Sequence, residues 1–110
     1  MRIPFPAEVP PAEQLGVVHF VGIGGSGLSA IARIMAQRGV RVQGSDARES
    51  AVLQALRAEG IRCFVGHDAA HLRDVDTVVA STAVREDNPE IVAPRERGLR
   101  LWPRSAGLAS

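Results

Sequence analysis

The sequence predicts an α/β protein with a Rossmann-like, open parallel sheet of five strands and helices on both faces. Short apolar segments alternate along the chain with segments of helical periodicity, which is the pattern of βαβ units. In addition, glycine followed by an apolar, an arginine and an apolar residue recurs in "RGVRV", "EGIRC" and "RGLRL". Each glycine is placed to end a helix in the left-handed conformation, after which the chain enters a strand.

Length and composition indicate one domain. A chain of 110 residues with 45% hydrophobic residues is large enough for a single core. Residues 1–14 contain four of the seven prolines and no periodicity. We therefore expect a flexible or extended lead-in over residues 1–14 and a folded domain over residues 15–110.

The first half of the domain contains two strand–helix units. A strand is expected at residues 17–21 and a helix at residues 26–38, where apolar residues recur at helical spacing. A second strand follows at residues 40–43. Ser50 is placed to cap the second helix, which ends at Gly60.

The second half continues the alternation. A helical turn is expected within residues 67–72 and a third helix at residues 89–97, although Pro94 lies inside that helix. The remaining strands are expected at residues 62–65, 77–80 and 99–102.

Charge and hydropathy argue against nucleic acid and membranes as partners. The net charge is only +1 and the basic residues are scattered, so no electrostatic footprint for a polyanion is present. No apolar run approaches the roughly 20 residues that span a bilayer. The proline-rich start also differs from a signal peptide.

Cysteine and lysine usage narrow the chemistry. The lone Cys63 cannot form an internal disulfide, and its place in an expected strand indicates a buried thiol. A reducing, cytoplasmic location fits this usage. All 13 basic residues are arginine, so a Walker-type phosphate loop and a Schiff base, which both need lysine, are excluded from this chain.

Three glycines form the strongest motif. Gly22, Gly24 and Gly27 have G-x-G-x-x-G spacing between the first strand and the first helix. In this context Gly22 allows the turn, Gly24 lets a pyrophosphate approach the backbone, and Gly27 lets the helix pack closely on the strand. The helix amides then face the anion. The alternative is that the glycines serve turn geometry only.

Asp46 follows the second strand, 19 positions after Gly27. Dinucleotide-binding folds place there an acid that binds a ribose hydroxyl. From these residues alone the ligand would be NAD. A solvated loop acid or helix cap is the alternative.

Other polar residues follow strands at the same edge of the sheet. Ser81 and Thr82 come after the fourth strand, which is expected beside the first, and can contact a phosphate or sugar or form a turn. His67 is either a binding residue or an exposed loop residue. His19 and His71 are expected to be structural.

The polar run at residues 85–89, "REDNP", is expected to form a loop and the N-cap of the third helix.

Five segments in order carry a family resemblance. They are "HFVGIGGSGLSAIARI", "GSD" at residues 44–46, "GH" at residues 66–67, "VVASTAVREDNPEI" at residues 78–91 and "PRSAGLA" at residues 103–109. From about residue 17 onward the chain resembles the N-terminal domain of the Mur ligases of peptidoglycan synthesis. Within that family it is most similar to the enzymes that join L-alanine to UDP-N-acetylmuramic acid. The related murein-tripeptide recycling ligases are the alternative, and their glycine loop usually departs from "GIGGSG".

The resemblance implies a different ligand from NAD. In the family this domain binds the UDP part of UDP-N-acetylmuramic acid, with the pyrophosphate at the glycine loop and the uridine among the residues that follow the other strands. The implied substrate-binding residues are Gly22, Gly24, Gly25, Ser26, Gly27, Ser45, Asp46, His67, Ser81, Thr82 and Ala83. No catalytic or metal-binding residue is implied, and a small NAD-binding module stays the alternative.

The resemblance also implies that the catalytic groups lie elsewhere. Family members have a central ATPase domain with a Gly-Lys-Thr loop and a C-terminal domain that receives the amino acid, and neither is in this lysine-free sequence. The whole enzyme would use ATP and magnesium to activate the muramyl carboxylate for attack by L-alanine. We expect the 110-residue chain alone to be inactive.

Overall fold

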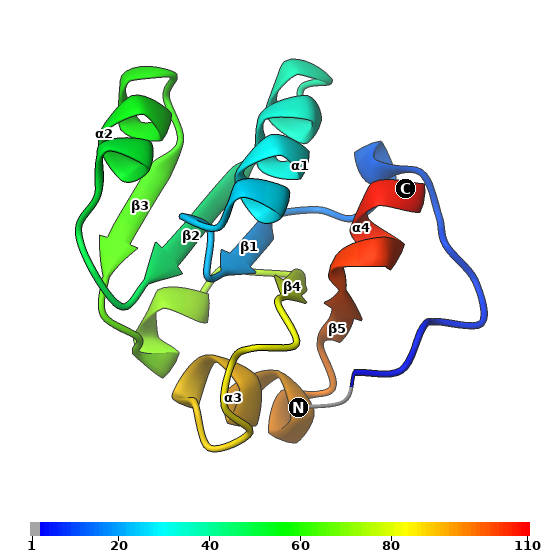
Figure 1. Ribbon diagram of the computed structural model, residues 1–110. Coiled ribbons are helices and arrows are strands. Elements are labelled where there is room, and N and C mark those ends of the chain that lie inside the picture. The colour runs from blue at the N-terminus through cyan, green and yellow to red at the C-terminus, as the bar shows by residue number, and fades with distance from the viewer. Residues whose placement is uncertain (1–2) are drawn as a thin grey trace.

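A five-stranded sheet lies between two layers of helices in the computed structural model, which describes residues 3–110 (Figure 1). All neighbouring strands are parallel, and their order is β3-β2-β1-β4-β5. The strands are β1 (Val18–Val21), β2 (Val42–Asp46), β3 (Arg62–Val65), β4 (Thr77–Ala80) and β5 (Arg100–Pro103). The predicted fold class is confirmed, and β4 lies beside β1 as expected.

Helices cover both faces of this sheet (Figure 1). The α-helices are α1 (Ser26–Gln37), α2 (Ala51–Ala58), α3 (Pro89–Arg97) and α4 (Arg104–Ala109). Two short 3-10 helices are η1 (Ala12–Gln14) and η2 (Ala69–Leu72). Ser50 caps α2 as predicted, because its Oγ accepts from Leu53 N at 3.2 Å. The sequence did not predict α4.

The recurring glycine pattern ends three helices, as predicted. Gly39, Gly60 and Gly98 have φ values of +86°, +89° and +68°. The residue after each glycine still donates to the preceding helix, as Val40 N does to Met35 O at 3.1 Å and Leu99 N does to Pro94 O at 3.0 Å. For this reason β2 and β5 begin later than residues 40 and 99, where they were expected.

The lead-in is partly packed rather than free. Ala12–Gln14 form η1, in which Ala12 is fully buried, and Ile3 is 7% exposed. The flexible or extended lead-in expected over residues 1–14 thus contains a helical turn at Ala12–Gln14 that the sequence did not predict. Its first two residues lie outside the described part of the chain.

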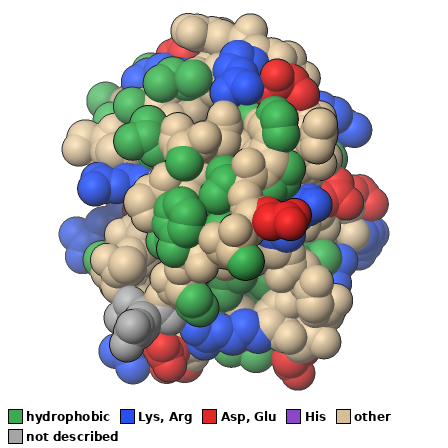
Figure 2. All heavy atoms as spheres, turned by 90° about the vertical axis from the view of Figure 1, so that its right-hand side faces the viewer, with side chains coloured by type: hydrophobic (Ala, Val, Ile, Leu, Met, Phe, Trp, Pro, Cys, Tyr) green, Lys and Arg blue, Asp and Glu red, His purple; other side chains and the backbone are tan. Residues whose placement is uncertain are grey.

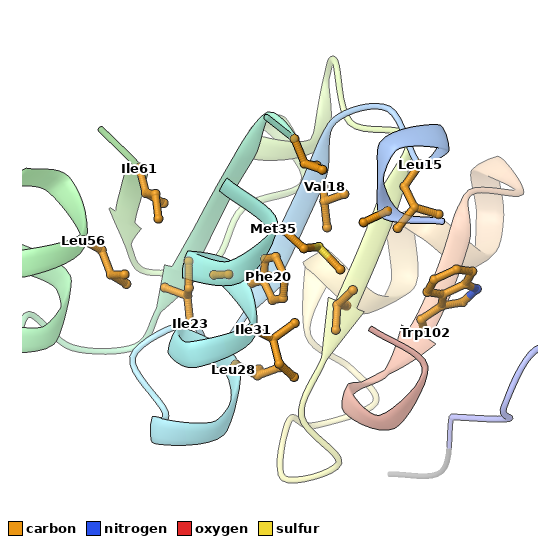
Figure 3. Packing of buried hydrophobic residues seen from close by; sticks show 14 of the residues in the cluster. Leu15, Val18, Phe20, Ile23, Leu28, Ile31, Met35, Leu56, Ile61 and Trp102 are labelled. Atoms are coloured by element: carbon orange, nitrogen blue, oxygen red, sulfur yellow. The ribbon is translucent and has the colours of Figure 1, made fainter. Parts of the chain in front are cut away.

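The two faces of the sheet pack against different clusters. Seventeen buried residues gather on the face covered by α1, α2 and α4, among them Phe20, Ile31 and Met35. Figure 3 shows the Phe20 ring of β1 directed toward α1. Within residues 3–110, the cluster under α3 and η2 has seven buried apolar residues, which include Val21, Val78 and Ile91. The smaller cluster leaves room for polar side chains on that face.

One side of the surface is partly apolar. Figure 2 shows hydrophobic side chains across the middle of the face that lies to the right in Figure 1, where the lead-in and α4 are found. Phe5 in the lead-in and Leu108 in α4 are 55% and 68% exposed. Along residues 3–110, every helix falls short of the length and apolarity that crossing a membrane would need.

Candidate functional site

A cleft of about 960 Å³ opens at the carboxyl ends of the strands, where the strand order reverses between β1 and β4. Open α/β sheets bind ligands at this point. Nine of the eleven predicted binding residues line the cleft: Gly22, Gly24, Gly25, Gly27, Asp46, His67, Ser81, Thr82 and Ala83. Ser26 and Ser45 do not line it. Ser45 is fully buried behind the cleft.

The glycine loop turns sharply after β1 and is tied to β2. Gly22 has a φ of +85°, a conformation that favours glycine. The amides of Gly22 and Ile23 both donate to Ser45 O, at 2.8 and 2.9 Å, and Gly25 N donates to Gly22 O at 3.0 Å. These amides are therefore committed to holding the loop.

Asp46, the last residue of β2, completes the loop. Its Oδ2 accepts from Gly24 N at 2.8 Å, and its Oδ1 accepts from Ala47 N at 2.8 Å. A Cβ atom added at Gly24 would stand 2.7 Å from Asp46 Oδ2. The close approach that Gly24 permits in this structure is thus to the Asp46 carboxylate, whereas the sequence predicted an approach to pyrophosphate.

The first turn of α1 presents free amide donors instead. Within residues 3–110, the N–H groups of Ser26, Gly27 and Leu28 have no hydrogen-bond partner. The Arg104 guanidinium lies against this turn, because a Cβ atom at Gly27 would be 2.5 Å from Arg104 Nη1. Arg104 also lines the cleft and has no acidic partner in the described chain. A cation at the positive end of a helix dipole is the arrangement that an anion would stabilise.

The opposite wall is formed by the segments after β4. Ser81 shapes a turn, since its Oγ accepts from Ala83 N at 3.1 Å and its carbonyl accepts from Val84 N at 3.1 Å. The predicted loop and cap at residues 85–89 are confirmed. Asn88 Oδ1 accepts from Glu90 N at 2.9 Å, and Arg85 pairs with Asp87 at 3.0 Å.

A buried carboxylate that the sequence did not predict lies behind this wall. Glu90 is fully buried, and all three histidines of the chain lie around it. Its Oε1 accepts from His19 Nε2 at 2.7 Å and from the Ser45 hydroxyl. Its Oε2 accepts from His71 Nδ1 at 2.7 Å and from Asp68 N at 3.1 Å.

His67 joins this network to the cleft. Its Nδ1 is 2.9 Å from Ser45 Oγ and 3.4 Å from Glu90 Oε1, while its side chain is 20% exposed. The structural roles predicted for His19 and His71 are confirmed. Glu90 lies inside the segment at residues 78–91 that carries the family resemblance, and that was the one feature of the sequence that pointed to it.

The surroundings of Glu90 favour its ionised form. Burial alone would raise the pKa of the carboxyl, but the hydrogen bond and electrostatic attraction of the His19 ring, together with hydrogen bonds from Ser45 and His71, outweigh burial and lower the pKa to about 2. Every buried polar side-chain atom in residues 3–110 has a partner. The network is therefore fully satisfied, as a buried charge requires.

The cysteine thiol and the potential metal ligands of the chain are further candidate sites of chemistry. Cys63 is buried in β3 as predicted, and burial raises the pKa of its thiol. In the described chain no group of three or more His, Cys, Asp or Glu residues is arranged to hold a metal ion.

Comparison with known proteins identifies the family. The sequence profile described as "Mur ligase family, catalytic domain" matches residues 17–110. UDP-N-acetylmuramate–L-alanine ligases from Nocardioides sp. and Acidothermus cellulolyticus are 63% and 65% identical over 110 and 100 residues, which are 100% and 91% of this chain. The chain spans 25% and 21% of the length of these two relatives.

Solved structures agree with this result. The UDP-N-acetylmuramate-alanine ligase from Thermotoga maritima superposes with a TM-score of 0.77 at 43% identity, over 80% of this chain and 20% of that one. A murein peptide ligase from Psychrobacter arcticus gives a TM-score of 0.79 at 27% identity, over 86% of this chain and 20% of that one. The profile covers most of the chain and a solved alanine ligase shares the fold over 80% of it, so this chain belongs to the Mur ligase family.

Proposed function

We propose that this chain binds the UDP moiety of UDP-N-acetylmuramic acid for an ATP-dependent ligase that joins L-alanine to the muramyl carboxylate. The names and identities of the relatives support this choice over the murein-tripeptide ligases, because eight alanine ligases are 46–65% identical to the chain. The observation that carries the proposal is the pairing of three free α1 amides with the unpaired Arg104 guanidinium in the cleft.

The diphosphate would lie beside the first turn of α1 and the Arg104 guanidinium. The amides of Ser26, Gly27 and Leu28 would donate to its oxygens, and Arg104 would neutralise its charge. The loop at Gly22, Gly24 and Gly25 would hold α1 in place, because its own amides bind Ser45 and Asp46 or close the turn.

The uridine would lie between β2 and β4. Asp46 and His67 form one wall of the cleft there, and the turn formed by Ser81, Thr82 and Ala83 forms the other. Ser45 would act from behind this wall through its hydrogen bond to His67.

ATP and magnesium would be bound outside residues 3–110, since no lysine and no metal-binding cluster is available in this part of the chain. When bound, they would supply the phosphoryl group that activates the muramyl carboxylate. This chain's residues would hold the nucleotide end of the substrate. The cytoplasmic location of the protein and the inactivity of the 110-residue chain stay predictions.

Calorimetric titration with UDP, UDP-N-acetylmuramic acid and NAD tests the proposal. Both uridine nucleotides should bind more tightly than NAD. Arg104→Ala should weaken UDP binding about ten- to one hundred-fold, the range for one charged hydrogen bond. The control is Arg73→Ala, which removes an exposed arginine that does not line the cleft, and it should bind as the unsubstituted chain does.

Tighter binding of NAD would assign the cleft to a dinucleotide. Equal affinities for Arg104→Ala and Arg73→Ala would show that the diphosphate does not lie at the first turn of α1.

A further inference from the structure

The hydrogen-bond pattern around Glu90 determines where protons lie in the network. Gln43 Nε2 lies 2.8 Å from the His71 carbonyl, which can only accept, so the nitrogen of this amide must face it. The same nitrogen lies 2.8 Å from His19 Nδ1. His19 therefore accepts at Nδ1 and donates its single proton from Nε2 to Glu90 Oε1.

The same argument extends to His67. The Ser45 hydroxyl has one proton, and it is directed to Glu90 Oε1. Ser45 Oγ can then only accept from His67, whose Nδ1 is 2.9 Å away. Glu90 Oε1, 3.4 Å from the same nitrogen, is a second acceptor. The proton of the neutral His67 ring must consequently lie on Nδ1.

This leaves the other ring nitrogen for the cleft. His67 lines the cleft, and within residues 3–110 its Nε2 has no hydrogen-bond partner. With the proton on Nδ1, Nε2 carries a lone pair. A ring in this state accepts a hydrogen bond from a ligand hydroxyl or imide N–H.

We propose that Glu90 is a positioning residue that holds His67, directly and through Ser45, in the Nδ1–H tautomer, so that Nε2 accepts a hydrogen bond from the nucleoside part of the ligand. Glu90 does not line the cleft and acts only through these two side chains. The inference rests on the proposed function for the identity of the ligand. The tautomer itself can be measured without any ligand.

The two carboxylate oxygens of Glu90 have different partners, which allows its effect on His67 to be tested separately from its effect on stability. Oε1 faces His19, Ser45 and His67, whereas Oε2 faces His71 and the backbone of Asp68. His71 stacks on Phe64 with ring centroids 3.9 Å apart and does not line the cleft. Substitution of the His71 side chain therefore removes a donor from Oε2 and leaves the donors to Oε1 in place.

The first measurement is the His67 tautomer, read from the ring ¹⁵N chemical shifts and two-bond couplings of the ligand-free chain in mildly alkaline buffer. The unsubstituted chain should show Nδ1–H. Glu90→Gln should shift the ring toward Nε2–H, because the amide can present an N–H where the carboxylate accepts. An Nε2–H ring in the unsubstituted chain would overturn the inference even if no variant folds.

The second measurement is UDP affinity by calorimetry for Glu90→Gln, Ser45→Ala and the control His71→Phe. The first two should weaken binding about ten-fold, as expected for one hydrogen bond, when measured on the folded fraction. His71→Phe should lower the melting temperature, because Oε2 loses a donor, but should leave the His67 tautomer and the UDP affinity unchanged.

The outcomes separate the two proposals. Failure of the unsubstituted chain to bind UDP would refute the proposed function, while the tautomer measurement would still decide the role of Glu90. Unchanged UDP affinity and tautomer in Glu90→Gln, or equal losses of affinity in Glu90→Gln and His71→Phe, would reduce Glu90 to a structural residue.

Discussion

The two faces of the sheet are built on different principles, although they share the same strands. On β1, Val18 and Phe20 belong to the apolar cluster under α1, whereas His19 meets the carboxylate of Glu90 on the opposite face. One face thus buries mainly hydrocarbon, and the other buries a charge with all of its donors beside a smaller apolar cluster.

The difference shows two ways in which one face of a sheet can be stabilised. Hydrocarbon packing stabilises without directing any group. A buried hydrogen-bond network stabilises only when every member is in place, and it therefore fixes the orientation of each one. In this chain the polar face reaches the cleft through Ser45 and His67, while α1 and α4 contribute donors to the cleft from the other face.

The largest expected effect on stability comes from removing a large buried side chain from the apolar face. Phe20 is fully buried, and Phe20→Ala should lower the free energy of unfolding by about 3 to 5 kcal/mol. Urea denaturation measures this loss. Because no titrating group of the polar face is touched, the loss should be the same near neutral pH and near pH 3. A loss that depended on pH would mean that the two faces are coupled.

A somewhat smaller effect should come from Glu90 and should depend on pH. Its pKa is lowered from 4.5 to about 2 in the folded chain, which corresponds to roughly 3 kcal/mol. The unfolded chain binds the proton first as pH falls. This stabilisation is therefore complete above about pH 4.5 and is lost as the pH falls toward 2.

Urea denaturation of the unsubstituted chain and Glu90→Gln across this range measures the contribution. The difference between their free energies of unfolding should be largest near neutral pH and should shrink on acidification. The exposed Glu49 and Asp87, whose pKa values are lowered by Arg57 and Arg85, titrate in both proteins and cancel in the difference. Parallel curves would mean that the Glu90 carboxylate is not preferentially stabilised in the folded state.

The apolar face was predictable because its pattern is local. Helical spacing located α1 and α2, and the glycines at residues 39 and 60 marked their ends. The short α4 was missed because Arg104–Ala109 offers too few residues for a periodic pattern. The predicted starts of β2 and β5 were too early. The residue after each glycine still donates its N–H to the preceding helix, so the strand begins only after it.

The polar face was not predictable in the same way. Glu90 is 71 residues from His19 and 45 from Ser45 in sequence, and no local periodicity links them. A glutamate after a capping asparagine is expected to be solvated. The glycine motif correctly located the cleft, but it could not show that Asp46 binds the Gly24 amide or that Arg104 approaches Gly27.

The smallest expected effect comes from removing a helix cap, and one cap from each face can be compared. Ser50 Oγ accepts from Leu53 N at the start of α2, and Asn88 Oδ1 accepts from Glu90 N at the start of α3. Ser50→Ala and Asn88→Ala should each cost about 1 kcal/mol in urea denaturation, the usual value for a lost cap. Only Asn88→Ala should also move the ring ¹⁵N signals of His67, because Asn88 fixes the backbone that carries the Glu90 carboxylate, whereas α2 packs on the apolar face. Equal shifts of the His67 signals in both variants would show that the network responds to any loss of stability, and the separation of the two faces would then be wrong.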